Sequence, residues 1–214
     1  MGARTHRAGG LDLRAEGTGQ ALPLQETFRW AAGQGQMEQH HRRRWGQAEK
    51  LAAWLGQEAL ATLTEDQALA LYRISGGART AQFRTNPIAE VRDSLDFLLY
   101  DTIKLESRFA ECAAADGAYK LAGAGKELAS CLLCLREPGL FAPWRPYTER
   151  ALRRLGMYPA TLKQGHLGLG YLDLLDALQV VRQQLALADF RWVDSFCYTV
   201  GQSNRPAKRG AGIG

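Results

Sequence analysis

Two glycines and a lysine between residues 121 and 129 have the spacing of an anion-binding turn. The segment reads LAGAGKELA, and Gly123 and Gly125 can both adopt positive φ and carry no Cβ, so the backbone can turn tightly there and approach another surface. A helix that begins near Lys126 leaves its first N–H groups unpaired, and the helix dipole adds positive potential. These residues predict a phosphate-binding turn. The alternative is an ordinary turn between two packed helices, with glycine as a C-cap.

The segment that follows favours the first interpretation. An apolar helix runs on from Ser130, a proline-containing loop surrounds Pro143, and a further helix ends at Gly156. In this order the parts resemble the helix-hairpin-helix (HhH-GPD) superfamily of DNA glycosylases, which includes 8-oxoguanine DNA glycosylase, over about residues 119–156. The resemblance implies a compact all-α domain with a helix-hairpin-helix module that grips the phosphate backbone of double-stranded DNA.

The catalytic positions of that superfamily are not matched. Arg145 stands where the resemblance places the catalytic aspartate, and Glu127 stands where it places the catalytic lysine. A guanidinium opposes the positive charge that develops on the sugar when a glycosidic bond breaks. We therefore expect DNA binding with no catalytic residue and no cofactor. Two interpretations of Glu149 stay open: a relocated acid in an active glycosylase, or, more simply, an i,i+4 ion pair with Arg145.

Arginines surround the module and complete the expected contact surface. Arg150 and Arg154 are four residues apart, so they share one face of a helix. Contacts to phosphate fix the position of a protein on DNA without reading its sequence, so binding should be largely sequence-independent. The residues expected to bind DNA are Gly123, Gly125, Lys126, Arg145, Arg150 and Arg154.

Two other basic clusters lie earlier in the chain. The densest is HHRRR at residues 40–44, whose three arginines span about 200° of a helix, so a solvated helix segment is the alternative to a phosphate contact. Arg79 and Arg84 follow the glycine pair at residues 76 and 77, where a basic loop could grip a backbone.

Composition agrees with a DNA-facing module. The chain has 214 residues, 46% of them hydrophobic, and a formal net charge of +5, which permits nucleic-acid binding. No apolar run reaches about 18 residues and the N-terminal residues lack the apolar core of a signal peptide, so we expect a cytoplasmic protein without a membrane partner. A DNA-binding subunit without catalytic residues could act together with a protein partner that supplies catalysis. A helical protein-interaction module is the alternative from another functional class.

Cys131 and Cys134 form a C-x-x-C pair within the apolar helix. Zinc sites of this type need a second pair, and Cys112 and Cys197 are single and distant in sequence. We expect these cysteines to be buried in the core and no metal site to be present.

Helical patterns predominate along the chain. A capping box at residues 64–67 predicts a helix start, and the stretch Ser75-Gly76-Gly77 predicts the end of that helix. We expect residues 1–20 to be disordered, residues 21–200 to form a single domain, residues 201–214 to form a flexible basic tail, and residues 165–170 to form a connecting loop. Other helices are expected at about residues 23–32, 36–57, 87–105, 171–187 and 189–200, and a helix from near residue 126 continues through the apolar residues 130–135.

Overall fold

The computed structural model describes residues 21–163 and 165–202, and within them the regular elements are helices without a strand. The all-α prediction is confirmed. The helices are α1 (Leu24–Gly33), α2 (Gln36–Trp45), α3 (Ala48–Ala53), α4 (Gln57–Ala61), α5 (Glu65–Ile74), α6 (Thr80–Phe83), α7 (Ile88–Tyr100), α8 (Leu105–Ala113), α9 (Lys126–Arg136), α10 (Pro146–Arg154), the 3₁₀ turn η1 (Ala160–Lys163), α11 (Leu167–Gln184) and α12 (Phe190–Gln202).

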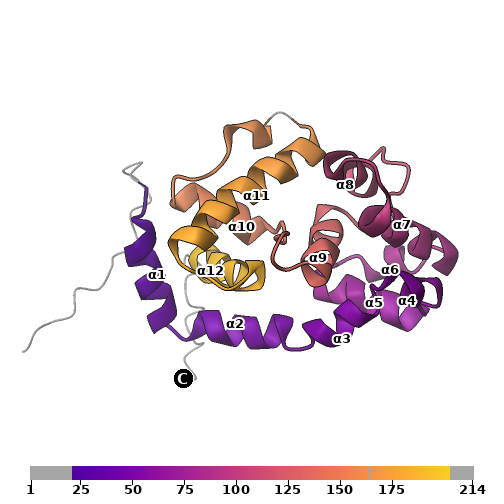
Figure 1. Cartoon of the computed structure of the whole chain (residues 1–214), viewed down its shortest axis with the longest axis horizontal. Coiled ribbons are helices and arrows are strands. Elements are labelled where there is room, and N and C mark those ends of the chain that lie inside the picture. The colour runs from indigo at the N-terminus through magenta and orange to yellow at the C-terminus, as the bar shows by residue number, and fades with distance from the viewer. Residues whose placement is uncertain (1–20, 164, 203–214) are drawn as a thin grey trace, which may run out of the picture.

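The helices gather around α9. In Figure 1, α10, α11 and α12 lie on one side of α9, α4 to α7 lie on the other, and α2 and α3 run along the edge that joins the two groups. The most extensive packing joins α10 to α12, α11 to α8, and α12 to α2.

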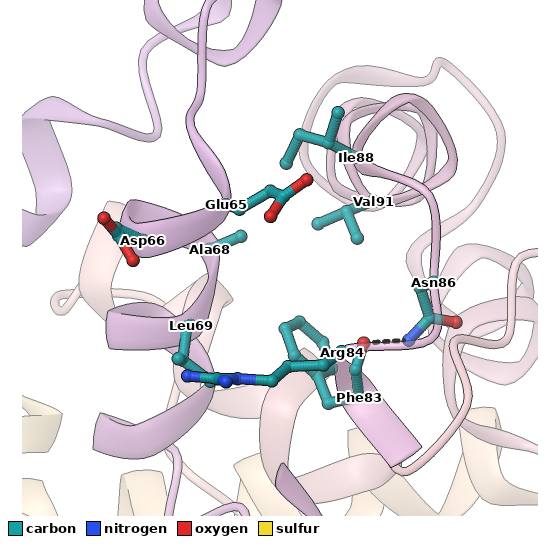
Figure 2. A pocket seen from close by; sticks show the side chains of 9 residues that line it. All are labelled: Glu65, Asp66, Ala68, Leu69, Phe83, Arg84, Asn86, Ile88 and Val91. Carbon is teal, nitrogen blue, oxygen red and sulfur yellow. Dashed lines mark hydrogen bonds between the residues drawn. The ribbon is translucent and has the colours of Figure 1, made fainter. Parts of the chain in front are cut away.

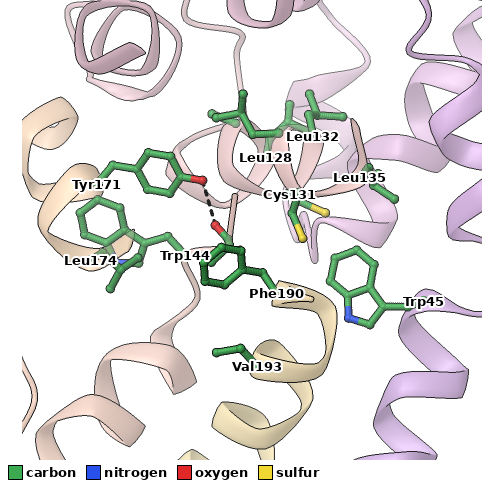
Figure 3. Close-up of a cluster of buried hydrophobic side chains, with 14 of the residues drawn as sticks. Trp45, Leu128, Cys131, Leu132, Leu135, Trp144, Tyr171, Leu174, Phe190 and Val193 are labelled. Atoms are coloured by element: carbon green, nitrogen blue, oxygen red, sulfur yellow. Dashed lines mark hydrogen bonds between the residues drawn. The ribbon is translucent and has the colours of Figure 1, made fainter. Parts of the chain in front are cut away.

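The central helix is apolar on all sides, which is the pattern of a buried helix. Every residue from Leu128 to Leu135 is buried, and Figure 3 shows this segment among Trp45 of α2, Tyr171 of α11 and Phe190 of α12. Cys131 and Cys134 have no exposed surface, so the prediction that the C-x-x-C pair is buried is confirmed.

The sequence signals that predict the two ends of α5 are present in the structure. The capping box is present, since the Gln67 amide donates to the Thr64 hydroxyl over 3.3 Å and the Thr64 amide donates to the Gln67 side chain over 2.8 Å. At the other end of α5, Gly76 has a φ of 81°, which glycine adopts without strain. Both predicted boundaries of this helix are therefore confirmed.

The single helix predicted over residues 36–57 is wrong. Helix α2 ends at Trp45, and Gln47 leaves helical geometry with a φ of −111° and a ψ of 13°. The break lets α2 pack on α12 while α3 packs on α9. Trp45 and Leu51 both reach the core, but they do so from two helices.

The apolar stripe expected to continue from residue 87 to residue 105 also stops early. Helix α7 ends at Tyr100, and Ile103 lies in the following loop with 45% of its surface exposed. Leu105 begins α8, whose packing against α7, α9 and α11 needs a different direction of the chain.

The connecting loop predicted at residues 165–170 is wrong from Leu167 onward, where α11 begins. Gly168 and Gly170 are helical and buried. A Cβ on Gly168 would lie 1.9 Å from the carbonyl oxygen of Glu106, so glycine here permits close packing of α11 on α8. The glycine pattern that predicts a connecting loop instead marks a close contact between two helices.

The predicted C-terminal tail begins two residues too early. Gly201 and Gln202 belong to α12, and a Cβ on Gly201 would lie 2.3 Å from the Tyr147 carbonyl oxygen of α10. The rest of that prediction, and the prediction for residues 1–20, lie outside the described residues. Among the helices described, none is both long and apolar enough to cross a membrane.

Candidate functional site

The glycine turn at residues 121–125 belongs to a long loop. Helix α8 ends at Ala113 and α9 begins at Lys126, so the segment between them is not the short connection of a helix-hairpin-helix. The helix-hairpin-helix module is therefore not confirmed. The helix predicted from Lys126 is present, and the second glycine of the turn, Gly125, is its N-cap residue.

Gly123 is packed against the protein itself. Its φ is 75°, and a Cβ would lie 2.9 Å from both the Arg79 carbonyl oxygen and the Phe83 amide nitrogen of the α6 region. The Tyr72 hydroxyl donates a hydrogen bond to the Gly123 carbonyl over 2.9 Å and accepts one from the Arg79 amide over 2.9 Å. Glycine is needed at 123 because two loops approach closely there.

Gly125 has a different environment. It is the N-cap residue of α9 in an extended conformation, with φ of −177°, and no side chain caps the helix. A Cβ on Gly125 would contact only the Glu127 carboxylate, at an ordinary 3.4 Å. Gly125 therefore borders open space at the N-terminus of α9, where the first N–H groups of a helix lack i−4 acceptors.

Arg145 reaches the same open space from the N-cap position of α10. One of its terminal nitrogens donates to the Ser75 carbonyl at the end of α5, whereas its buried Nε has no hydrogen-bond partner among the described residues. A Cβ on Gly76 would overlap the guanidinium. Gly76 therefore provides the room that Arg145 occupies, and the Arg145 side chain keeps N–H donors that can bind a ligand.

These features meet in one cavity of about 320 Å³, which we call the hairpin cavity. Its walls are the α5–α6 loop at residues 75–79, the turn at residues 123–125, the first turn of α9 and the start of α10 with Arg145. Backbone N–H groups, Arg79 and Arg145 give it donors and positive charge. Glu127 also lines it and contributes one opposing carboxylate.

Lys126 turns away from this cavity toward Glu149. Its Nζ lies 2.7 Å from Glu149 Oε1 and 4.2 Å from the centre of the Trp144 ring, while the Trp144 indole N–H donates to the same carboxylate oxygen over 2.8 Å. Arg153 adds a second ion pair with Glu149 at 3.4 Å. The predicted pairing of Glu149 with Arg145 is wrong, because Arg145 is engaged with Ser75 on α5.

The environment of Glu149 favours its ionised form. Burial alone raises the pKa of this carboxyl, but the hydrogen bonds from Lys126 and Trp144 and the charges of Lys126 and Arg153 outweigh burial and lower the pKa. A carboxylate held by this many donors is a weak base and a poor proton donor.

Arg150 and Arg154 share a helical face, as predicted, and that face contacts α12. Arg150 Nε donates to the Gly201 carbonyl over 3.0 Å, and Arg154 donates to the Val200 carbonyl over 2.5 Å. Neither residue lines the hairpin cavity. The structure thus brings Gly123, Gly125 and Arg145 together and places Lys126, Arg150 and Arg154 elsewhere.

Sequence reasoning missed a buried polar network that links three helices. Asp194 of α12 is 3% exposed and accepts hydrogen bonds from the Tyr147 hydroxyl at 2.7 Å and the Trp45 indole at 3.1 Å. Arg44 Nε lies 3.0 Å from the same carboxylate, although not in line for a hydrogen bond. An aspartate inside the apolar pattern of residues 190–202 is the signal that could have revealed it.

A further cavity, of about 340 Å³, lies between α5, α6 and α7. Figure 2 shows Glu65 reaching over it toward Ile88 and Val91, with Arg84 on the opposite side. Because Glu65 and Asp66 both line it, this cavity is a poor place for a phosphate. Within the described part of the chain, no group of three or more histidines, cysteines or acids is placed to hold a metal ion.

Comparisons with protein families, with curated proteins and with solved structures find no match to this chain. The resemblance of residues 119–156 to DNA glycosylases therefore stays a hypothesis that depends on those residues alone.

Proposed function

We propose that this protein binds the phosphate backbone of double-stranded DNA, largely without regard to sequence, and that it does not cleave glycosidic bonds. The single observation that carries the proposal is the hairpin cavity, where an uncapped helix N-terminus meets two cationic side chains, Arg79 and Arg145. Helix N-terminal N–H groups and arginine are the protein groups best suited to phosphate.

A ligand in this cavity would meet donors from three directions. The N–H groups at the start of α9 supply fixed dipoles, and Arg145 supplies a guanidinium that is already immobilised against Gly76 and Ser75. Arg79 is exposed and can follow the ligand. Since all these groups address phosphate oxygens, they position DNA and give little discrimination between bases.

Glu127 weakens the attraction of this cavity for an anion, and its removal tests whether the cavity binds one. Its carboxylate lies at the rim of the cavity, near the N-terminus of α9, where it competes with an anionic ligand for the same positive potential. Removal of that charge in Glu127→Gln should therefore strengthen DNA binding, whereas a cavity with no role in binding an anion leaves affinity unchanged.

The absence of catalysis is proposed on chemical grounds. Arg145 occupies the position of the superfamily's carboxylate and disfavours a cationic sugar. Lys126 and Glu149 do come together at 2.7 Å, which is the observation that favours an active glycosylase. However, an ion-paired lysine is a poor Schiff-base nucleophile, and Glu149 is held as a carboxylate by several donors.

Fluorescence anisotropy with a labelled duplex of about 20 base pairs tests the binding proposal at several salt concentrations. The test variant is Arg79→Gln, and the matched control is Arg29→Gln, which removes the same charge from α1. We expect Arg79→Gln to flatten the plot of log Kd against log salt by about 0.9 for the lost phosphate contact, and the control to leave the slope unchanged.

A single-turnover assay with excess protein and duplexes that carry oxidised, alkylated or deaminated bases tests the second part. We expect no base release and no covalent adduct after borohydride reduction. Base release that disappears in Glu149→Gln would instead establish the alternative, a glycosylase with a relocated acid.

A further inference from the structure

The basic segment at residues 40–44 forms one wall of a groove between α2 and α5, which we call the arginine groove. Its volume is about 500 Å³, larger than that of the hairpin cavity. Arg42, Arg43 and Arg44 line it from α2, and Arg73 lines it from α5.

The charges in this groove are of one sign. No acidic residue lines it, and Arg42, Arg43 and Arg73 are exposed without a carboxylate partner among the described residues. His40 adds no positive charge near neutral pH, because burial lowers its pKa to about 4. The groove therefore presents three unneutralised guanidinium groups to solvent.

Arg44 has a different role from its neighbours. Its Nε is paired with the buried carboxylate of Asp194 and its NH1 donates to the Ile74 carbonyl over 2.7 Å. It thereby fixes α2 to the C-terminal end of α5. All three arginines line the groove, but the Arg44 guanidinium is held by Asp194 and Ile74, whereas Arg42 and Arg43 remain exposed.

The arginine groove and the hairpin cavity lie on either side of the end of α5. Ile74 lines the groove and its carbonyl receives Arg44, whereas Ser75 lines the hairpin cavity and its carbonyl receives Arg145. Two consecutive peptide carbonyls thus anchor one arginine from each site. The two sites are therefore neighbours in the fold, and a nucleic acid carries phosphates at regular spacing.

We propose that the arginine groove is a second phosphate-backbone site, which extends the contact made at the hairpin cavity along the same DNA duplex. This rests on the proposed function. A duplex is favoured over a single strand because, in the part of the chain that the structure describes, no tryptophan, tyrosine or phenylalanine lines the groove. Single-strand sites depend on aromatic rings on which bases stack.

The test compares Arg42→Gln/Arg43→Gln with the control Arg29→Gln/Lys104→Gln, which removes the same two charges from α1 and from the start of α8. Circular dichroism establishes that both are folded. With a duplex of about 20 base pairs, we expect the groove variant to flatten the salt slope by about two units and the control to change it little. A single strand of the same length should bind less tightly than the duplex to the wild-type protein.

The outcomes separate this proposal from the proposed function. If Arg79→Gln lowers the slope but the groove variant does not, the hairpin cavity stands and the groove proposal fails. If the groove variant lowers it and Arg79→Gln does not, the groove stands and the hairpin cavity fails. Vesicles that contain phosphatidylserine provide the remaining arm: loss of vesicle binding in the groove variant, with duplex binding intact, would reassign the groove to an anionic membrane surface and overturn the proposal.

Discussion

Replacement of Asp194 by asparagine should severely destabilise the fold. The carboxylate has no exposed surface. It accepts hydrogen bonds from the Tyr147 hydroxyl and the Trp45 indole, and it forms an ion pair with the Arg44 guanidinium. Asparagine keeps an oxygen for Tyr147, but its NH₂ group then faces two other donors. The side chain of Arg44 is 11% exposed, and its guanidinium is left without a counter-charge.

We expect a loss of about 3–5 kcal/mol in the free energy of unfolding, which is the usual cost of removing one partner from a buried ion pair. Equilibrium denaturation in urea, followed by circular dichroism, measures it. Glu49→Gln is the matched control, because Glu49 also pairs with an arginine, Arg191 at 3.1 Å, but is 90% exposed. This control should lie within about 1 kcal/mol of the wild type.

A second variant keeps the measurement informative when Asp194→Asn is too unstable to purify. Trp45→Phe removes one hydrogen bond to the network and keeps most of the ring, so it should cost about 1 kcal/mol plus a small packing term. Values for Asp194→Asn within about 1 kcal/mol of the wild type would refute the assignment of Asp194 as the counter-ion that holds Arg44 in place.

Three further predictions concern the start of α9, the contact between α10 and α12, and the buried His40. Gly125→Val should fold normally, since its Cβ meets only Glu127, but weaken duplex binding by about 1–3 kcal/mol by obstructing the α9 N-terminus; unchanged affinity in an anisotropy titration contradicts it. Arg150→Gln/Arg154→Gln should lower the melting temperature and leave the salt slope unchanged, because both guanidinium groups bond α12; a flatter slope would show that they contact DNA. Because burial lowers the pKa of His40 from 6.5 to about 4, the folded state binds fewer protons than the unfolded state between those pH values. Stability is therefore full above pH 6.5 and falls by up to about 3 kcal/mol toward pH 4; a wild-type unfolding free energy as steep in pH as that of His40→Gln contradicts this.

Signals that act within a few residues were readable from the sequence. The capping box at residues 64–67 placed a helix start correctly, because its hydrogen bonds involve neighbours in the chain. The burial of Cys131 and Cys134 followed equally from the apolar residues around them.

Contacts between distant segments were not readable. The glycine-rich spacing of residues 165–170 predicts a connecting loop, and only the close approach of the Glu106 carbonyl on α8 explains why Gly168 lies in a helix. The sequence favours an i,i+4 ion pair between Glu149 and Arg145, whereas the fold pairs Glu149 with Lys126 of α9, which lies 23 positions earlier in the chain. The hairpin cavity also depends on residues 75–79, which lie more than forty positions before the turn. The sequence marks them as a basic loop after a glycine pair, but no local signal shows that this loop packs against the turn.

The most direct test of the central claim is the affinity of the wild-type protein for a DNA duplex at about 50 and about 200 mM salt. Five arginines line the two sites without a carboxylate partner in the described structure, Arg79 and Arg145 in the cavity and three in the groove. At about 0.9 units of slope for each contact, this fourfold rise in salt should weaken binding by about 500-fold. No binding at the lower salt concentration, or affinity that changes less than about threefold between the two, would contradict a protein that grips the phosphate backbone.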